Sequence, residues 1–142
     1  MPTSANPPAL LVDTSVAIAL IVADHAAHES VTAVIGGRAL GLAGHAAFET
    51  FSVLTRLPAP LRRTPAAARR LIDENFPATR FLGGRAAARL LERLPDLGIS
   101  GGAVYDAVVA ATAAEHGLVL ATRDRRALAT YRALDVMVEV WD

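Results

Sequence analysis

The sequence predicts a single α/β domain with a central parallel sheet of about four to five strands and helices on both faces. Short, continuous apolar runs such as Ala9–Val12 and Leu118–Ala121 are typical of strands that are buried on both faces. Helical segments alternate with these runs along the chain, which is the element order of a parallel sheet. The 142 residues suffice for one domain of ordinary size, and no internal repeat divides them.

The first half of the chain supplies two of the expected strands and four of the helices. In order, we expect a strand at Ala9–Val12, helices at Ser15–Val22 and Ala26–Ile35, a strand at Ala39–Ala43, and helices at His45–Arg56 and Pro65–Asn75. Gly36 and Gly37 end the second helix, because glycine readily adopts the left-handed conformation that follows a helix. Thr64 is a typical capping residue, and Pro65 suits the first helical position.

The second half of the chain completes the alternation. We expect a short strand at Thr79–Leu82, helices at Gly84–Leu94 and Ala103–His116, a strand at Leu118–Ala121, a short helix at Arg125–Tyr131, and a strand at Val136–Val140. Pro95 is expected to stop the helix before it, because proline lacks the amide hydrogen that a helix interior needs. Gly117 is the C-terminal signal of the next helix.

Two residue types are absent, and each absence excludes a class of chemistry. The chain has no cysteine, which excludes a disulfide framework, a thiolate metal site and a cysteine nucleophile. It also has no lysine, which excludes a P-loop and Schiff-base catalysis. Ser15 has neither a nucleophile elbow nor a matching histidine, so a serine hydrolase is not predicted.

The N-terminal residues 1–8 are polar and proline-rich, and we expect them to be flexible, with residues 9–142 forming the domain. They lack the basic start and apolar run of a signal peptide. No apolar stretch approaches the roughly 20 residues that span a bilayer. The expectation is a cytoplasmic protein without membrane contact.

Four acidic residues stand in apolar or strand-end positions that need an explanation. Asp13 ends the first apolar strand, and Asp124 follows the Leu118–Ala121 strand, where ligands bind in open α/β sheets. Asp106 lies inside a helix, on a stripe with apolar neighbours three and four positions away. Glu49 shares its helix face with Ala46 and Val53, which are also apolar.

Converging carboxylates repel one another, and the chain contains no lysine to neutralise them. A hard divalent cation with oxygen ligands, Mg²⁺ or Mn²⁺, is the physical solution that we expect. Simpler explanations stay open for each acid considered alone. Asp13 and Asp124 could cap helices, and Glu49 could be solvated. His25 and His28 are three positions apart, but scattered surface histidines are common and metal binding there is not expected.

Four short motifs carry a resemblance to PIN-domain nucleases over nearly the whole chain, from Leu10 to Val140. Leu11–Val16 (LVDTSV) resembles the opening strand motif, and Ala47–Thr50 (AFET) resembles the helical glutamate motif. Val104–Ala111 (VYDAVVAA) resembles the third acidic motif, and Leu120–Asp124 (LATRD) resembles the last. Each motif alone is weak, but the four occur in the family's order and spacing.

The resemblance implies a single-strand-specific ribonuclease fold with a Mg²⁺ or Mn²⁺ centre. Asp13 and Asp106 would be direct metal ligands, and Glu49 and Asp124 would act directly or through water. Thr14, Ser15 and Thr122 would be supporting hydroxyls, and hydrolysis would need no covalent enzyme intermediate. In size the chain resembles a bacterial VapC toxin. This resemblance implies a homodimer and a small VapB-like antitoxin that inhibits the nuclease.

The distribution of charge favours a nucleic-acid substrate although the net charge is zero. Residues 56–93 hold nine arginines and three acids, a balance of +6, and the remainder is −6. Arg85 and Arg89 lie four positions apart on one predicted helix face, and Arg123 adjoins Asp124, so we expect these three to bind RNA backbone. A merely solvated helix face is the alternative explanation for either basic helix alone.

Two other functions are alternatives to the ribonuclease toxin. A non-catalytic PIN-like module that binds RNA or protein would not need four repelling carboxylates. A phosphatase or receiver-type domain built on Asp13 would be expected to pair it with a lysine, which this chain lacks.

Overall fold

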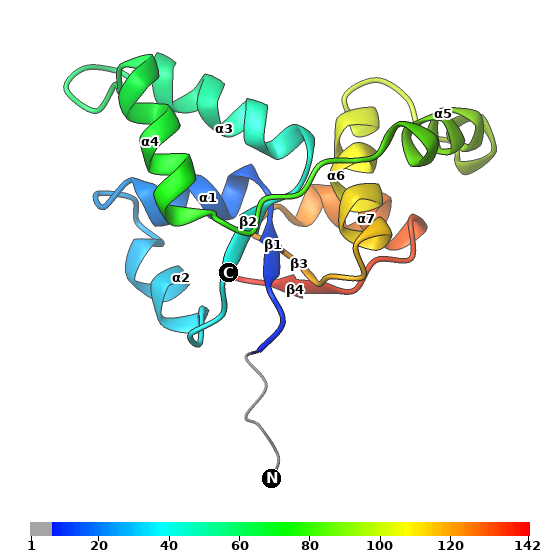
Figure 1. Ribbon diagram of the computed structural model, residues 1–142, viewed down its shortest axis with the longest axis horizontal. Helices are drawn as coiled ribbons and strands as arrows, with labels where there is room; N and C mark the ends of the chain where they lie inside the picture. Colours follow the sequence, from blue (N-terminus) through cyan, green and yellow to red (C-terminus); the bar gives the residue numbers. More distant parts are fainter. Residues whose placement is uncertain (1–6) are drawn as a thin grey trace, which may run out of the picture.

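The computed structural model describes residues 7–142 and contains a four-stranded parallel sheet (Figure 1). The predicted flexible segment 1–8 lies outside the described residues except for its last two positions. The strands are β1 (Leu10–Val12), β2 (Leu40–Leu42), β3 (Leu120–Thr122) and β4 (Val138–Val140), in the order β2-β1-β3-β4. Every neighbouring pair is parallel, which confirms the predicted α/β fold.

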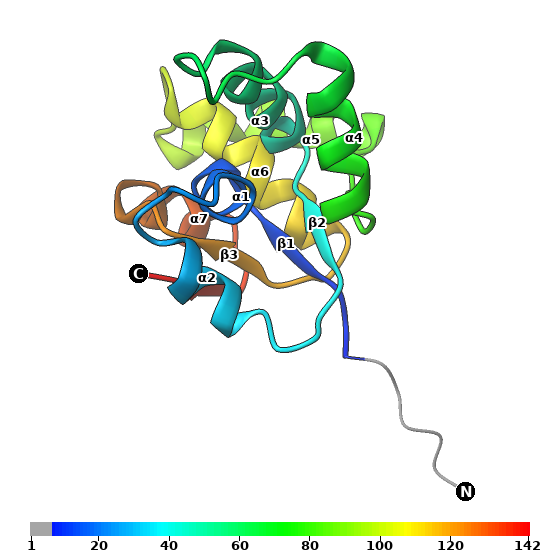
Figure 2. The same cartoon turned by 90° about the vertical axis from the view of Figure 1, so that its left-hand side faces the viewer.

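Seven α-helices and one short 3₁₀ segment connect the strands in the described part of the chain. They are α1 (Thr14–Ile21), α2 (His28–Val34), α3 (His45–Arg56), α4 (Pro65–Asn75), α5 (Gly84–Leu97), α6 (Ala103–Glu115), the 3₁₀ segment Arg125–Ala127, and α7 (Leu128–Ala133). Helices α1 and α2 lie on one face of the sheet and α6 and α7 on the other, as right-handed crossovers require (Figure 2).

Helix α5 does not end where the sequence predicted. Pro95 lies inside its last turn, and the helix continues to Leu97 before Gly98 closes it with a φ of 68°. The Gly98 amide donates to the carbonyl oxygens of Leu94 and Pro95. Carbonyl groups of the last turn therefore have a hydrogen-bond donor although the helix extends two residues beyond the proline. A proline in a last turn removes only one helical hydrogen bond, and the glycine cap offsets that loss.

The predicted strand Thr79–Leu82 is wrong in detail. This segment runs beside β2 but forms only one isolated parallel bridge, between Ala43 and Arg80. Gly41 permits this close approach, because a Cβ atom there would lie 2.2 Å from the Ala78 carbonyl oxygen. The Thr79 hydroxyl accepts the Leu42 amide hydrogen at 3.0 Å, so a side chain replaces part of the backbone ladder.

The core is continuous across both faces of the sheet. Leu11, Val12 and Leu120 are inaccessible to solvent, and helix residues such as Val16 and Leu54 pack with them in one cluster. Burial on both faces explains why β1 and β2 carry no polar side chain, whereas the edge strand β4 is only half-buried and includes Glu139. No helix among residues 7–142 is long and apolar enough to cross a bilayer.

Candidate active site

All four predicted acidic residues line one cavity of about 340 Å³ at the carboxyl edge of the sheet. The lining residues are Asp13, Thr14, Ser15, Ile18, His25, Glu49, Asp106, Val109, Arg123, Asp124 and Tyr131. The acids come from four separate segments: the ends of β1 and β3, and helices α3 and α6. Because parallel strands end at the same edge, residues more than a hundred positions apart meet there.

Asp13 lies at the centre of a dense hydrogen-bond network and is 5% exposed. Its Oδ1 accepts the Ser15 hydroxyl at 2.5 Å and the Val16 amide at 3.3 Å. Its Oδ2 accepts the Thr122 hydroxyl at 2.5 Å and the Tyr131 hydroxyl at 2.8 Å. The three shorter bonds engage three of the roughly four lone-pair sites of a carboxylate, and the long contact from the Val16 amide leaves the fourth, on Oδ1, only weakly engaged.

The two strand-end aspartates cap helices as well as lining the cavity. Asp13 is the N-cap of α1, and Asp124 caps the 3₁₀ segment by accepting the Arg126 amide at 3.0 Å. The two aspartates therefore act as helix caps and line the cavity at the same time, so one role does not exclude the other. A cap places its carboxylate at a helix N-terminus, and the same position faces outward from the strand end.

Asp106 is the carboxylate whose charge is least well accommodated. It lies in the first turn of α6, half-buried, and no side chain or amide among the described residues donates a hydrogen bond to it. Burial raises the pKa of Asp106, and the negative charges of Asp124, Asp13 and Glu49 raise it further. The cavity therefore holds unneutralised negative charge, which a cation would relieve.

Glu49 lies at the rim of the cavity rather than on a buried face. Its side chain is 48% exposed, so the apolar face predicted around it does not bury it. His45 lies one turn earlier on α3, with its Nε2 3.8 Å from Glu49 Oε2. Gly44 starts this helix with a φ of 52°, and a Cβ atom there would lie 2.5 Å from the Thr112 hydroxyl of α6. This close approach sets α3, and with it Glu49, against α6.

The predicted supporting residues divide into those near the cavity and those far from it. Thr14, Ser15 and Arg123 line it, and Thr122 lies directly behind Asp13. The Ser15 hydroxyl also accepts the Arg123 amide at 2.8 Å, which ties α1 to the loop after β3. Arg85 and Arg89 are exposed on α5 and do not line this cavity.

Two polar residues of the cavity, Tyr131 and His25, were not among the predicted site residues. Tyr131 is buried on α7 and contacts Asp13, from which 118 positions separate it. Only its position near the last acidic motif could have drawn attention to it. His25 also lines the cavity, and its Nδ1 accepts the Ala27 amide hydrogen at 3.0 Å. A neutral His25 therefore carries its proton on Nε2.

The donor set suits a hard divalent cation. All the acidic groups offer oxygen, and Mg²⁺ and Mn²⁺ prefer oxygen ligands. Among residues 7–142, no three acidic or histidine side chains are close enough to enclose an ion by themselves. The fit to a divalent cation therefore rests on the carboxylates of four separate segments that line one cavity.

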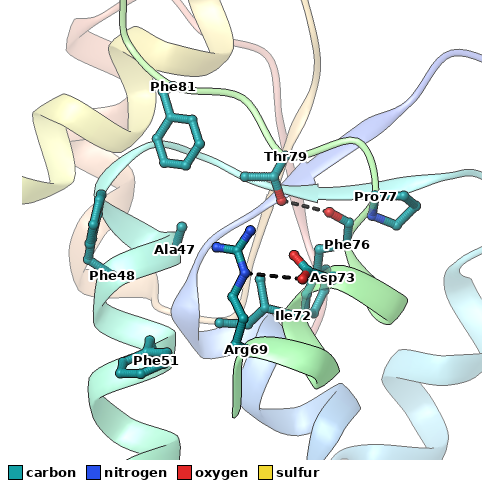
Figure 3. A pocket seen from close by; sticks show the side chains of 10 residues that line it. All are labelled: Ala47, Phe48, Phe51, Arg69, Ile72, Asp73, Phe76, Pro77, Thr79 and Phe81. Atoms are coloured by element: carbon teal, nitrogen blue, oxygen red, sulfur yellow. Dashed lines mark hydrogen bonds and ion pairs between the residues drawn. The ribbon is translucent and has the colours of Figure 1, made fainter. Parts of the chain in front are cut away.

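Two further cavities on the α3 side are apolar. One, of about 510 Å³, lies between α3 and α4, with Phe48, Phe51 and Phe81 in its lining (Figure 3). The other, of about 440 Å³, includes Phe48 and Phe81 together with Leu90 and Leu91 of α5. Phe48 is 68% exposed and Leu91 70% exposed, which is unusual for such large apolar side chains.

Comparisons with known proteins agree with this architecture. The PIN domain family model matches residues 10–133. The chain is 52% identical over 133 residues to Ribonuclease VapC27 of Mycobacterium tuberculosis, which covers 94% of this chain and 97% of that relative. It is 40% identical over 130 residues to Ribonuclease VapC40 of the same species, with 90% and 96% covered.

A solved structure agrees in fold. The crystal structure of VapBC2 from Rickettsia felis, bound to a DNA fragment from their promoter, matches with a TM-score of 0.67 and 12% identity. The match covers 94% of this chain and 98% of that chain. With the family model matched over most of its length and two VapC ribonucleases among its relatives, the chain belongs to the PIN-domain family.

Proposed function

We propose that this protein is a metal-dependent endoribonuclease toxin that hydrolyses phosphodiester bonds of RNA and is neutralised by a cognate antitoxin. The convergence of Asp13, Glu49, Asp106 and Asp124 on one cavity carries the proposal. Two relatives named as ribonucleases support the reaction. A non-catalytic module is not favoured, because such a module gains nothing from holding Asp106 among three other carboxylates.

Asp13 and Asp106 would hold the cation, Mg²⁺ or Mn²⁺, and Glu49 and Asp124 would act directly or through water. Ser15 and Thr122 orient Asp13 through their hydroxyls, and Thr14 lies beside them. When bound, a divalent cation activates water for attack on phosphorus and offsets negative charge on the phosphate. The acids need no covalent bond to the substrate in this scheme.

The metal requirement can be tested on the purified protein with single-stranded RNA. We expect cleavage to stop in excess EDTA and to return with Mg²⁺ or Mn²⁺. Adding either ion should also raise the melting temperature, since a ligand that binds only the folded state stabilises it. Cleavage that continues at the wild-type rate in EDTA would contradict the proposal, and Ca²⁺ serves as a control for general ionic effects.

Arg123 is the arginine best placed to meet the RNA backbone. Its Nε is buried at the cavity and has no hydrogen-bond partner among the described residues. A buried unpaired donor beside an acidic site is suited to a phosphate oxygen. Arg125, two positions later, is exposed and pairs with Asp142, so it offers a matched control.

We expect Arg123→Gln to weaken RNA binding and to lower the slope of log affinity against log salt by about one, while Arg125→Gln changes neither. Binding is measured in EDTA, where no cleavage should occur. The proposed contact of Arg85 and Arg89 stays a prediction, tested by reversing both to Glu. An unchanged salt slope in that variant would favour the solvated-face explanation for α5.

The apolar cavity between α3 and α4 is the surface that we propose for the antitoxin. It shares α3 with Glu49, so a segment bound there can continue toward the acidic cavity. Basic side chains on that segment would be attracted by the same carboxylates that attract the cation. The structure named VapBC2 supports an antitoxin partner of this general kind.

We expect Phe48→Ser to weaken antitoxin binding by about tenfold or more, because exposed aromatic side chains often dominate interfaces. Phe48 is 68% exposed, so the fold should tolerate the change. The measurement is titration calorimetry with the antitoxin's C-terminal peptide, and inhibition by that peptide should be partly relieved by high Mg²⁺. Val34→Ser, an exposed apolar change on α2, is the control. Equal affinity of the two variants for the peptide would contradict a docking site at the cavity between α3 and α4.

A homodimer stays a prediction and rests on the exposed apolar side chains around α5. Leu91, Phe81 and Tyr105 are each more than half exposed, a clustering that monomeric surfaces seldom show. Light scattering at micromolar concentration measures the mass directly, and a monodisperse monomer would contradict the dimer.

A further inference from the structure

Tyr131 joins the C-terminal helix to the acidic cavity through one hydrogen bond. Its side chain is 1% exposed, and its hydroxyl donates to Asp13 Oδ2 at 2.8 Å. The second donor to the same oxygen is the Thr122 hydroxyl, whose residue is fully buried. Two rigid, buried groups from separate elements, β3 and α7, therefore hold one oxygen of the carboxylate.

The other carboxylate oxygen is held differently. Oδ1 accepts from Ser15, which is partly exposed, and from the Val16 amide at 3.3 Å, the longest of the four bonds. The terminal torsion of an aspartate is broad, so hydrogen bonds rather than rotamer preference decide how the carboxylate is turned. The buried pair on Oδ2 fixes this rotation and leaves Oδ1 with the weaker set of donors.

We propose that Tyr131 is a positioning residue, which fixes the rotation of Asp13 so that this carboxylate meets a divalent cation in one orientation. The inference rests on the proposed metal centre. It adds a residue outside the four acidic motifs, from the helix that follows β3 along the chain. A hydrogen bond from a neutral hydroxyl to a carboxylate is charge-assisted and about twice as strong as a neutral one. It is therefore strong enough to restrain the torsion.

A purely structural role would explain the same bond, because a buried tyrosine hydroxyl needs a partner. The two roles differ in what Tyr131→Phe changes. A structural role predicts lower stability with unchanged metal affinity. A positioning role predicts weaker metal binding by protein that is fully folded, because Asp13 then loses one of the two restraints on Oδ2.

We expect Tyr131→Phe to bind Mn²⁺ about tenfold more weakly than the wild type, in the range that residues supporting metal ligands show. Titration calorimetry well below the melting temperature measures the affinity of folded protein. Thr55→Val is the control, because it deletes a half-buried hydroxyl that donates to the Phe51 carbonyl at 3.0 Å and does not line the acidic cavity. It should keep wild-type affinity.

The outcomes separate this inference from the proposed function. Wild-type protein that binds no Mn²⁺ would overturn both. Wild-type protein that binds Mn²⁺, with Tyr131→Phe binding equally well, would overturn the positioning role alone. In turnover assays, kcat should fall in Tyr131→Phe while KM for RNA stays unchanged, since Tyr131 is only 1% exposed and its hydroxyl is engaged by Asp13.

A spectroscopic measurement keeps the test valid if Tyr131→Phe folds poorly. The chain has two tyrosines, so Tyr105→Phe leaves Tyr131 as the only tyrosine signal. A cation on Asp13 withdraws charge from Oδ2 and weakens the bond that it accepts from Tyr131. Saturating Mg²⁺ should therefore shift the tyrosine bands that report hydrogen bonding in ultraviolet resonance Raman spectra. Unshifted bands in protein that binds Mg²⁺ would overturn the proposal.

Discussion

Asp106→Asn should reduce RNA cleavage by more than about 100-fold, beyond the 10–100-fold that residues merely supporting a metal site cost. At the same time it should raise the melting temperature of the metal-free protein. Burial, followed by the charges of Asp124, Asp13 and Glu49, raises the pKa of Asp106. Its ionised form is therefore disfavoured in the folded state, and a neutral amide of the same shape removes that repulsion.

The pH dependence of this stabilisation follows from the direction of the pKa shift. A carboxyl whose pKa is higher in the folded state than in the unfolded state contributes stability at low pH. That contribution is lost as the pH rises through the folded-state pKa. The gain in melting temperature of Asp106→Asn over wild type should therefore be largest at neutral pH. It should vanish at pH values below the pKa of the unfolded aspartate.

Differential scanning fluorimetry in EDTA across this pH range measures the stability, and a single-turnover RNA assay measures cleavage. Asp96→Asn serves as the control, because Asp96 is an exposed residue of α5 and its change should alter neither property. A variant that is inactive but less stable than wild type would show that Asp106 is a structural residue. An active variant would remove it from the proposed site.

The parts of the site that the sequence predicted are those that local patterns encode. Asp13 and Asp124 follow apolar runs, so the rule for strand ends in parallel sheets brings them together. The apolar neighbours of Asp106 one turn away indicate the core side of its helix, and α6 carries it there half-buried. The same reasoning was wrong about Glu49, whose side chain is 48% exposed because α3 turns it toward the rim.

The parts that could not be predicted depend on tertiary contacts. The bond between Tyr131 and Asp13 joins α7 to the end of β1, and no local pattern encodes it. Pro95 was expected to end α5, yet the helix continues past it, and Gly98, three residues later, caps the end instead. The segment around Thr79 was expected to be a strand, but the Thr79 hydroxyl takes a backbone hydrogen bond of β2.

Asp13→Ala should abolish cleavage as well, but its effect on stability should have the opposite sign to that of Asp106→Asn. Asp13 accepts four hydrogen bonds, and two of its donors, the hydroxyls of Thr122 and Tyr131, are buried. Leaving a buried donor unpaired costs about 1–3 kcal/mol, so we expect a loss of roughly 2–4 kcal/mol in the free energy of unfolding. The relief of repulsion on Asp106 acts in the other direction, but it is the smaller effect because Asp106 is only half-buried.

Urea denaturation in EDTA measures this loss, with Asp124→Ala as the matched control. Asp124 also lines the cavity, but from residues 7–142 its carboxylate accepts only the Arg126 amide at 3.0 Å and a long contact from the Arg126 side chain. Its replacement should therefore cost about 1 kcal/mol, as for an ordinary helix cap. Equal losses in the two variants would mean that the four bonds to Asp13 stabilise the fold no more than an ordinary helix cap does. A stabilised Asp13→Ala would mean that repulsion among the carboxylates outweighs those bonds.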